Sequence, residues 1–197
     1  MSLQTRQRTQ AGFTLFEVMI ATVVLFVGLL GLAGSLAAGL AWMSVSQYEY
    51  IAQQKASEAI ESIFTARDQG QATWSTICNV GSTICPSGIF LSGPQPLCDP
   101  GADGIVGTAD DYSTSACTDL AHTDSVLLPN SSGVFGATPV RMPLTQLNFQ
   151  RTITISSVSN GSSTVANLRK IQITITYRAG RWPQRTYTMN AAISNFS

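Results

Sequence analysis

Hydrophobic residues fill one continuous stretch near the start of the chain. From Val18 to Met43 the sequence has 26 positions and no charged residue, whereas a membrane-spanning helix needs about 20 apolar residues. Glu17 directly precedes this stretch, and a carboxylate at that depth in a membrane costs several kcal/mol unless it faces a partner. We therefore predict a transmembrane helix over residues 13–43 and a functional reason for Glu17.

The hydrophobic pattern becomes periodic after Met43. Apolar residues recur at three- and four-residue steps with Gln, Lys and Glu between them; they are Val45, Tyr48, Ile51 or Ala52, Ala56, Ala59, Ile60 and Ile63 or Phe64. This spacing is typical of an amphipathic helix. We predict that the same helix continues over residues 44–66 and ends before Gly70, a residue type common just after helices.

The last third of the chain alternates apolar and polar residues. Residues 147–155, 171–177 and 185–193 read as strands, and residues 160–163 form a link rich in Asn, Gly and Ser. An antiparallel sheet over residues 147–194 needs a cover on its apolar face. The amphipathic helix supplies that cover, so the predicted fold class is α+β, with a long N-terminal helix packed on a C-terminal antiparallel sheet.

The first 12 residues contain Arg6 and Arg8 but no acid. Positive charge beside a membrane helix keeps that end in the cytoplasm, so residues 44–197 form an exported head. A secretory signal peptide also has a basic start, but its apolar core is only about 7 to 15 residues long. The longer apolar run therefore favours a membrane helix over a secretory signal.

Residues 71–143 are rich in Gly, Ser, Thr, Pro and Asp and have few periodic apolar positions. A compact domain seldom holds so long a loop without fixing it in place. Disulfides form outside the cytoplasm, and four cysteines allow three connectivities. We favour Cys78 with Cys85 and Cys98 with Cys117, because each pair closes a local loop. The alternative, a metal-thiolate site, is disfavoured because the chain has no Cys-x-x-Cys pair.

The second of these loops contains a cluster of carboxylates, namely Asp99, Asp103, Asp110 and Asp111, on a chain segment rich in glycine. Oxygen donors on a flexible loop suit Ca²⁺, which takes about 6 to 8 oxygen ligands. The donor spacing and the final Glu of an EF-hand are missing. The alternative is a solvated acidic turn, and in either case a cation should offset the carboxylates, although no basic residue lies nearby in sequence.

Lys plus Arg and Asp plus Glu number 11 each, so net charge does not indicate a nucleic-acid partner. The charges are segregated: no Lys or Arg lies between Arg67 and Arg141, and no acid follows Asp124. We expect the acidic middle and the basic end to pair with each other; the alternative is a basic ligand-binding face. No Gly-x-Ser-x-Gly or phosphate-binding glycine motif occurs, and His122 is the single histidine, so the sequence does not indicate an enzyme.

Gly12-Phe13-Thr14-Leu15-Phe16-Glu17, placed after a short basic leader and before a long apolar run, resembles the type IV pilin family, which includes the type II secretion pseudopilins. The resemblance implies that prepilin peptidase cleaves after Gly12 and methylates the new amine of Phe13, so that residues 1–12 are a cleaved leader. It also implies that Glu17 acts in assembly.

Two further segments resemble parts of this family. Residues 24–34 look like the corresponding stretch of minor pilins of the PilV type. The acidic loop resembles the calcium loop of type II major pseudopilins, with Asp103, Asp110 and Asp111 in matching positions. The glycines of the apolar segment, Gly28, Gly31, Gly34 and Gly39, are interpreted as sites of close helix packing with local flexibility.

The resemblance implies a minor pilin that assembles into a helical filament of a type IV pilus. Its partners would be other pilin subunits, prepilin peptidase and the inner-membrane assembly platform. Before assembly it would cross the bacterial inner membrane once, and after assembly it would lie in a periplasmic or cell-surface pilus. The alternatives are a type II secretion pseudopilin and a surface-anchored binding or adhesion module.

Overall fold

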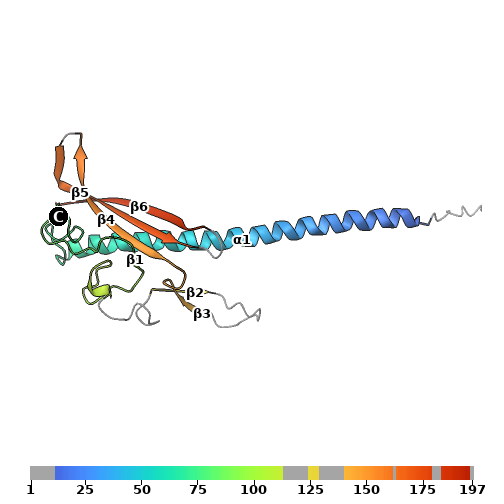
Figure 1. The fold of residues 1–197 in the computed structure, drawn as a ribbon, viewed down its shortest axis with the longest axis horizontal. Coiled ribbons are helices and arrows are strands. Elements are labelled where there is room, and N and C mark those ends of the chain that lie inside the picture. Colours follow the sequence, from blue (N-terminus) through green and yellow to red (C-terminus); the bar gives the residue numbers. More distant parts are fainter. Residues whose placement is uncertain (1–11, 113–123, 129–139, 162, 179–182, 196–197) are drawn as a thin grey trace, which may run out of the picture. The chain divides into compact units, whose positions relative to one another are not determined.

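The computed structural model describes residues 12–112, 124–128, 140–161, 163–178 and 183–195. It has one long helix near the N-terminus and antiparallel strands near the C-terminus, which confirms the predicted α+β class (Figure 1). The chain divides into two compact units, Met1–Ser44 and Val45–Ser197. The functional boundaries proposed for the leader, membrane helix and head stay predictions.

The helix α1 runs from Leu15 to Asp68. Gly70 has a φ of 73°, and its amide donates to the Arg67 carbonyl at 2.9 Å. A left-handed glycine just after a helix reverses the chain without a steric penalty on a Cβ atom. The helix therefore ends where the sequence predicted, at a glycine that follows its last turn.

One face of α1 within the second unit is buried. Its residues recur at steps of three and four and are at most 1% exposed: Ala52, Ala56, Ala59, Ile63 and Ala66. Four of these five side chains are alanines, so the helix backbone can approach its neighbours closely. The sheet supplies the bulk opposite them, because its inward side chains are mostly isoleucines of the same core cluster.

The main sheet has the strand order β1-β4-β5-β6, and every pairing in it is antiparallel. Its strands are β1 Gln95–Pro96, β4 Gln150–Asn160, β5 Ser163–Tyr177 and β6 Arg185–Ser194. Ile171, Ile173 and Ile175 of β5 are fully buried, while the residues between them are partly exposed. The predicted alternation therefore does separate a core face from an outer face.

Strands β4 and β5 continue beyond β6 as a two-stranded arm (Figure 1). The pairing of β5 with β6 stops at Leu168, whereas β4 and β5 stay paired up to Asn160 and Ser163. A register shift between Ser157 and Val158 marks a bulge in this arm. Both strands are longer than the sequence pattern predicted, because polar residues of a solvent-exposed arm carry no alternation signal.

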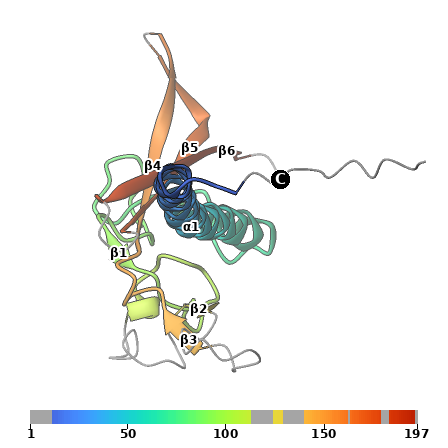
Figure 2. The same cartoon turned by 90° about the vertical axis from the view of Figure 1, so that its right-hand side faces the viewer.

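A second, two-stranded sheet pairs β2, Ser125–Leu128, with β3, Val140–Pro143. It is not hydrogen-bonded to the main sheet, and in the view of Figure 2 it lies below β4, β5 and β6. The short helix η1 spans Asp110–Tyr112.

Stacked aromatic rings join α1 to the main sheet. The centroid of the Tyr48 ring lies 5.8 Å from that of Phe149, and the Phe149 centroid lies 5.3 Å from that of Tyr177.

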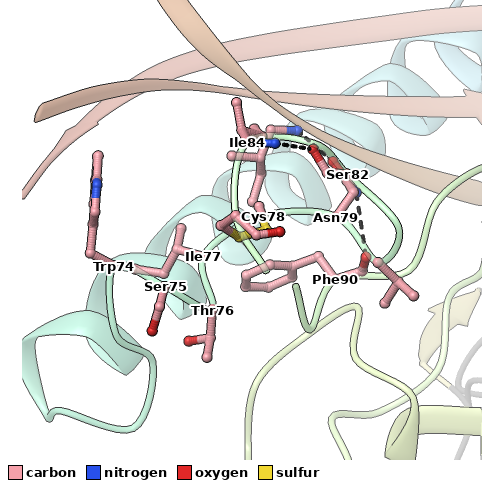
Figure 3. The surroundings of a disulfide bond; sticks show 12 residues. Trp74, Ser75, Thr76, Ile77, Cys78, Asn79, Ser82, Ile84 and Phe90 are labelled. Atoms are coloured by element: carbon pink, nitrogen blue, oxygen red, sulfur yellow. Dashed lines mark hydrogen bonds between the residues drawn. A yellow bond between two sulfur atoms is a disulfide. The ribbon is translucent and has the colours of Figure 1, made fainter. Parts of the chain in front are cut away.

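The loop after α1 is fixed by a disulfide and by one asparagine (Figure 3). Cys78 and Cys85 are bonded, with their Cα atoms 6.3 Å apart, which confirms that predicted pair. The Asn79 amide nitrogen donates to the Ile153 carbonyl at 2.7 Å, and its oxygen accepts from the Ile155 amide at 2.8 Å. Asn79 thus takes the place of a neighbouring strand at the edge of β4.

Candidate functional site

Helix α1 begins directly after the predicted processing site. The hydroxyl of Thr14 accepts a hydrogen bond from the Glu17 amide at 3.3 Å, and its carbonyl accepts from the amides of Glu17 and Val18. Thr14 is therefore the N-cap, with Glu17 three residues later, which is the spacing of a capping box. This local chemistry sets the start of the helix and leaves Gly12 and Phe13 outside it.

Gly12 is exposed, and a Cβ atom added to it would meet nothing within 4 Å. Its φ does not lie in the left-handed region that favours glycine. The described part of the subunit therefore gives no steric reason for glycine at this position. A requirement for a small residue at position 12 must come from contact with another molecule.

Glu17 occupies the first turn of α1 and is exposed. A carboxylate there is stabilised by the positive end of the helix dipole by about 0.3–1 kcal/mol at the surface. Phe13 and Glu17 lie along one side of the segment, together with Ala21. This placement fits pairing of Glu17 with the Phe13 amine of a cleaved chain, either in the same subunit or in a neighbouring one.

The first unit presents an uncovered apolar surface. Its large exposed hydrophobic side chains, which begin at Phe13 and end at Met43, are between 50% and 82% exposed. This part of α1 is long and apolar enough to cross a membrane. Its four glycines, Gly28, Gly31, Gly34 and Gly39, have open space where a Cβ atom would lie. Packing within the subunit therefore does not account for them.

The acidic loop brings three of its four predicted carboxylates together. One oxygen each from Asp103, Asp110 and Asp111 lies within 4.8 Å of the other two. Asp99 is not part of this group. The loop folds around the carboxylates, since Asp111 accepts hydrogen bonds from the amides of Gly101 at 2.9 Å and Gly107 at 2.6 Å.

The pKa values of two carboxylates in the loop are shifted in opposite directions, because burial outweighs hydrogen bonding at Asp111 and hydrogen bonding outweighs burial at Asp110. Burial raises the pKa of Asp111, although hydrogen bonds from Gly107 and Gly101 and the charge of Arg151 act to lower it. Burial also acts to raise the pKa of Asp110, but hydrogen bonds, chiefly from the Thr108 hydroxyl and the Asp103 amide, outweigh it and leave that pKa lowered. The environment therefore favours the ionised form of Asp110 and disfavours the ionised form of its neighbour Asp111.

Arg151 of β4 is the cation that the acidic loop lacks in its own sequence. It is 2% exposed, and its Nη2 atom has no hydrogen-bond partner among the described residues. Its charge acts on Asp111. Three carboxylates offset by one guanidinium leave a formal charge that one divalent cation would balance. The oxygen donors of this loop therefore fit Ca²⁺ in chemistry and in spacing.

A second charged group ties β2 to α1. Lys55 contacts Asp124 at 2.7 Å and Glu58 at 2.6 Å, and the Lys55 and Asp124 side chains are only 13% and 14% exposed. Burial raises the pKa of Asp124 although Lys55 acts to lower it. The acidic middle thus finds one of its cations on the helix, and another, Arg151, on β4. The charge of Arg151, in the basic C-terminal third, acts on Asp111, and the wider pairing of the acidic middle with that third stays a prediction.

Cys98 is buried and disulfide-bonded. Its predicted partner, Cys117, lies outside the described residues, as does His122. The pairing of Cys98 with Cys117 therefore stays a prediction.

Sequence reasoning missed three residues that organise the head. The sequence pattern marks Arg151 only as a strand residue of the basic C-terminal end and Lys55 only as a polar position of the amphipathic helix, and it does not mark Asn79. Arg151 did carry a signal, because it occupies an inward position of a predicted strand where an apolar residue is usual. Lys55 and Asn79 carry no such signal, because Asp124 lies 69 residues from Lys55 and Ile153 lies 74 residues from Asn79 in sequence.

Residues 7–33 match the family described as the prokaryotic N-terminal methylation motif. No curated protein and no solved structure matches the chain. The motif supports a type IV pilin-like protein, which is a substrate of prepilin peptidase, assembles with other pilins and serves as a structural subunit. Together with the apolar part of α1, it fits a protein anchored in a membrane before assembly.

Proposed function

We propose that the chain is a minor pilin, a structural subunit of a type IV pilus. Prepilin peptidase cleaves it between Gly12 and Phe13 and methylates the Phe13 amine. The inner-membrane assembly platform then moves the apolar segment, residues 13–43, from the bilayer into a filament. There the apolar helices of neighbouring subunits replace the lipid.

The observation that carries this proposal is the uncovered apolar surface next to the methylation motif. A helix that exposes at least half of each large apolar side chain is stable in lipid or among other apolar helices, but not in water. The head has a core of its own and does not use this segment. The segment therefore serves the membrane and the assembly of subunits.

The test is the composition of filaments sheared from cells that express the tagged chain. We expect the mature chain, beginning at Phe13, in the sheared pili, and we expect loss of surface pili when its gene is deleted. A type II secretion pseudopilin would instead be needed for the export of enzymes while surface pili remain. A monomeric surface-anchored binding or adhesion module would give no crosslinks to other pilins in living cells.

We also propose that the acidic loop binds Ca²⁺ through Asp103, Asp110 and Asp111, with Asp99 outside the ligand set. The convergence of one oxygen from each of three carboxylates within 4.8 Å supports this proposal. Bound Ca²⁺ would offset the remaining negative charge and hold residues 99–111 against the sheet. The ion would have a structural role.

The calcium proposal is tested by thermal unfolding of the full-length protein in detergent. Ligand at about 100 times its Kd stabilises a fold by about 2.7 kcal/mol, so Tm should rise between chelator and millimolar Ca²⁺. Asp110→Asn should reduce this rise, whereas Asp68→Asn, on the exposed end of α1, should leave it unchanged. Equal Tm values of the wild-type protein in chelator and in Ca²⁺ would return the loop to a solvated acidic turn.

A further inference from the structure

The head has a pocket between the loop that follows α1 and the arm formed by β4 and β5. Its volume is about 680 Å³, and small-molecule sites typically have about 300–1,000 Å³. Figure 3 shows the loop that forms one wall of the pocket. Apolar side chains come from both sides, namely Trp74, Ile84 and Pro86 from the loop and Val165 and Leu168 from β5. All of these residues belong to the second unit, so the pocket is a feature of the head itself.

Arg169 of β5 is the one charged residue among the described residues that line this pocket. It is 6% exposed, and its Cζ atom lies 4.0 Å from the centroid of the Trp74 ring. Burial lowers the pKa of Arg169, and no described acid offsets this effect. Removing a cation from water without a counter-ion is unfavourable. The pocket therefore contains a positive charge that the described head leaves without a negative partner.

The guanidinium of Arg169 uses one of its three nitrogens to hold the fold together. Its Nη1 atom donates to the backbone carbonyls of Trp74 and Ile77. These two bonds use both hydrogens of Nη1. The Nε and Nη2 atoms of Arg169 have no hydrogen-bond partner among the described residues. An arginine side chain therefore lies in the pocket with two of its nitrogens still free to donate.

The two free nitrogens are accessible to a ligand. Among the described residues, the fully buried side-chain nitrogen without a partner is Nη2 of Arg151, so Nε and Nη2 of Arg169 are not fully enclosed. The N–H groups of Nε and Nη2 on one edge of a guanidinium are parallel, and they match the two oxygens of a carboxylate. The fold thus leaves open the edge of Arg169 that suits a planar anion.

The walls of the pocket are held in place without a ligand. The two bonds from Arg169 fix the loop to β5, and the Cys78–Cys85 disulfide closes the same loop, in which Cys85 lines the pocket. A site that is already ordered loses little conformational entropy when a ligand binds. Four hydroxyl groups also line the pocket and can bond to polar atoms of a ligand; they belong to Thr73, Ser75, Ser157 and Thr164.

We propose that this pocket binds a small organic ligand through one carboxylate group, which Nε and Nη2 of Arg169 hold. A single unpaired guanidinium balances a single negative charge, which favours a carboxylate over a phosphate dianion. The mixed apolar and hydroxyl lining suits an organic body beside that group. A carboxylate of this kind occurs on uronic acid sugars and on acylated amino acids. The inference does not depend on assembly into a pilus.

The experiment measures the Kd of matched acids and amides for the full-length protein in detergent by ligand-observed NMR. The acids are glucuronate and N-acetylleucine, and the neutral controls are glucuronamide and N-acetylleucinamide. We expect at least one acid to bind, and its amide to bind at least about tenfold more weakly, because the amide lacks the charge that strengthens both bonds to Arg169. The acid that binds more tightly identifies a sugar or an amino acid as the source of the carboxylate.

Three results would overturn the proposal. One is that neither acid binds, and another is that an amide binds as tightly as its acid. The third is that inorganic sulfate binds as tightly as both acids, which would indicate a site for anions in general.

A substitution beside Arg169 tests the position of the site and keeps both bonds from Arg169 to the loop. Thr164→Glu, at an exposed position that lines the pocket, places a carboxylate within the pocket that competes for the guanidinium. It should weaken binding of the acid at least about tenfold. Thr154→Glu makes the same substitution at an exposed position of β4 outside the pocket and should leave the Kd unchanged. Wild-type affinity of Thr164→Glu, with an unchanged Tm, would place the bound acid elsewhere and contradict the proposal.

Discussion

Single polar side chains fix much of this structure by bonding to backbone groups, both within one loop and far away in sequence. Asn79 bonds to two residues of β4, and Asp111 accepts the amides of Gly101 and Gly107. A buried backbone group without a partner costs about 1–3 kcal/mol. These side chains therefore decide how an irregular region packs against a regular sheet.

Gly12 should be needed for processing and not for folding. Gly12→Ala should impair cleavage and Gly12→Glu should block it, because the peptidase requires a small residue next to the membrane while the fold leaves open space there. The uncleaved precursor should accumulate in the membrane with its head folded. N-terminal sequencing and intact mass measure the outcome.

Gly28→Ala is the matched control for this prediction, since it changes a glycine of the apolar segment away from the cleavage site. It should be cleaved normally. A mature chain beginning at Phe13 in the Gly12→Glu strain would show that cleavage does not occur after Gly12.

Glu17→Gln should lower incorporation into filaments without affecting cleavage or membrane insertion. Glutamine also serves at this position of a capping box, so the substitution removes the charge and keeps the helix start. Opposite charges 4 Å apart attract by about 4 kcal/mol at an effective dielectric constant of 20. This attraction energy is the upper limit of what the substitution would remove from the pairing of the Phe13 amine with Glu17.

The measurement is the ratio of this subunit to the major pilin in sheared filaments. Glu61→Gln, an exposed carboxylate in the head part of α1, is the control and should assemble at the wild-type ratio. A wild-type ratio for Glu17→Gln would mean that the carboxylate does not guide assembly.

The buried carboxylate of Asp111 should make stability depend on pH. Its pKa is raised in the folded state, so its contribution to stability is present below its ordinary pKa and is lost as pH rises through the folded value. The Tm of the wild-type protein minus that of Asp111→Asn should therefore increase as pH falls from 7 towards 4 in chelator. A difference that stays constant or decreases over this range would contradict the assignment.

At the scale of elements, α1 contacts three different partners with three different chemistries. Its alanine-rich face packs on the isoleucines of the main sheet, Tyr48 stacks on Phe149, and Lys55 binds Asp124 at the start of β2. Only the first of these is visible as a periodic pattern in the sequence. The ion pair, together with packing of Val126 against the core, attaches the small β2–β3 sheet to the rest of the head.

Lys55→Met should destabilise the head by about 1–3 kcal/mol, because it leaves the nearly buried Asp124 carboxylate without its lysine. The double variant Lys55→Met/Asp124→Asn should recover part of this loss, since no unpaired charge remains. Denaturant unfolding of the four proteins of the cycle measures the coupling between the two residues. Additive effects of the two substitutions would show that the pair contributes nothing to the fold.

At the scale of the whole molecule, the two units differ in where their apolar side chains lie: the second unit buries them, and the first unit exposes them. Val45–Ser197 encloses a core in which α1 residues, loop residues and the sheet all take part. The first unit has no buried residue among those whose exposure the structure describes. One unit is therefore built to be stable in water, and the other to be stable among apolar neighbours.

The head alone, residues 45–197, should fold without detergent and unfold cooperatively, because its core does not include the apolar segment. Circular dichroism during heating measures this. Ala59→Asp should abolish the transition by burying an unpaired carboxylate, while Gln53→Asp, exposed on α1, should keep it. A head that aggregates or unfolds without a cooperative transition would show that the segment contributes to the fold.

The sequence correctly predicts those features that depend on a short local pattern of apolar and polar residues. The charge-free run from Val18 to Met43, the heptad-like alanines and the alternating isoleucines each follow from repeat periods of single elements. It fell short at β1, β2 and β3, which are short strands inside a region without periodicity, and at the arm formed by the ends of β4 and β5. It placed Asp99 in the calcium ligand set because the four aspartates are close in sequence, whereas the fold separates Asp99 from the other three.

The sequence by itself determined the apolar and amphipathic parts of the helix, the methylation motif and the α+β class, because local bonding and hydrophobic period decide these features. The helix begins at Leu15, after its cap Thr14, and not at residue 13 as predicted. Only the tertiary structure decided that the charge of Arg151 acts on Asp111, that Lys55 pairs with Asp124, and that Asn79 completes the edge of β4. Each of these contacts joins residues far apart in the chain. Their geometry depends on how the helix and sheets pack, and a linear pattern of residue types does not contain that information.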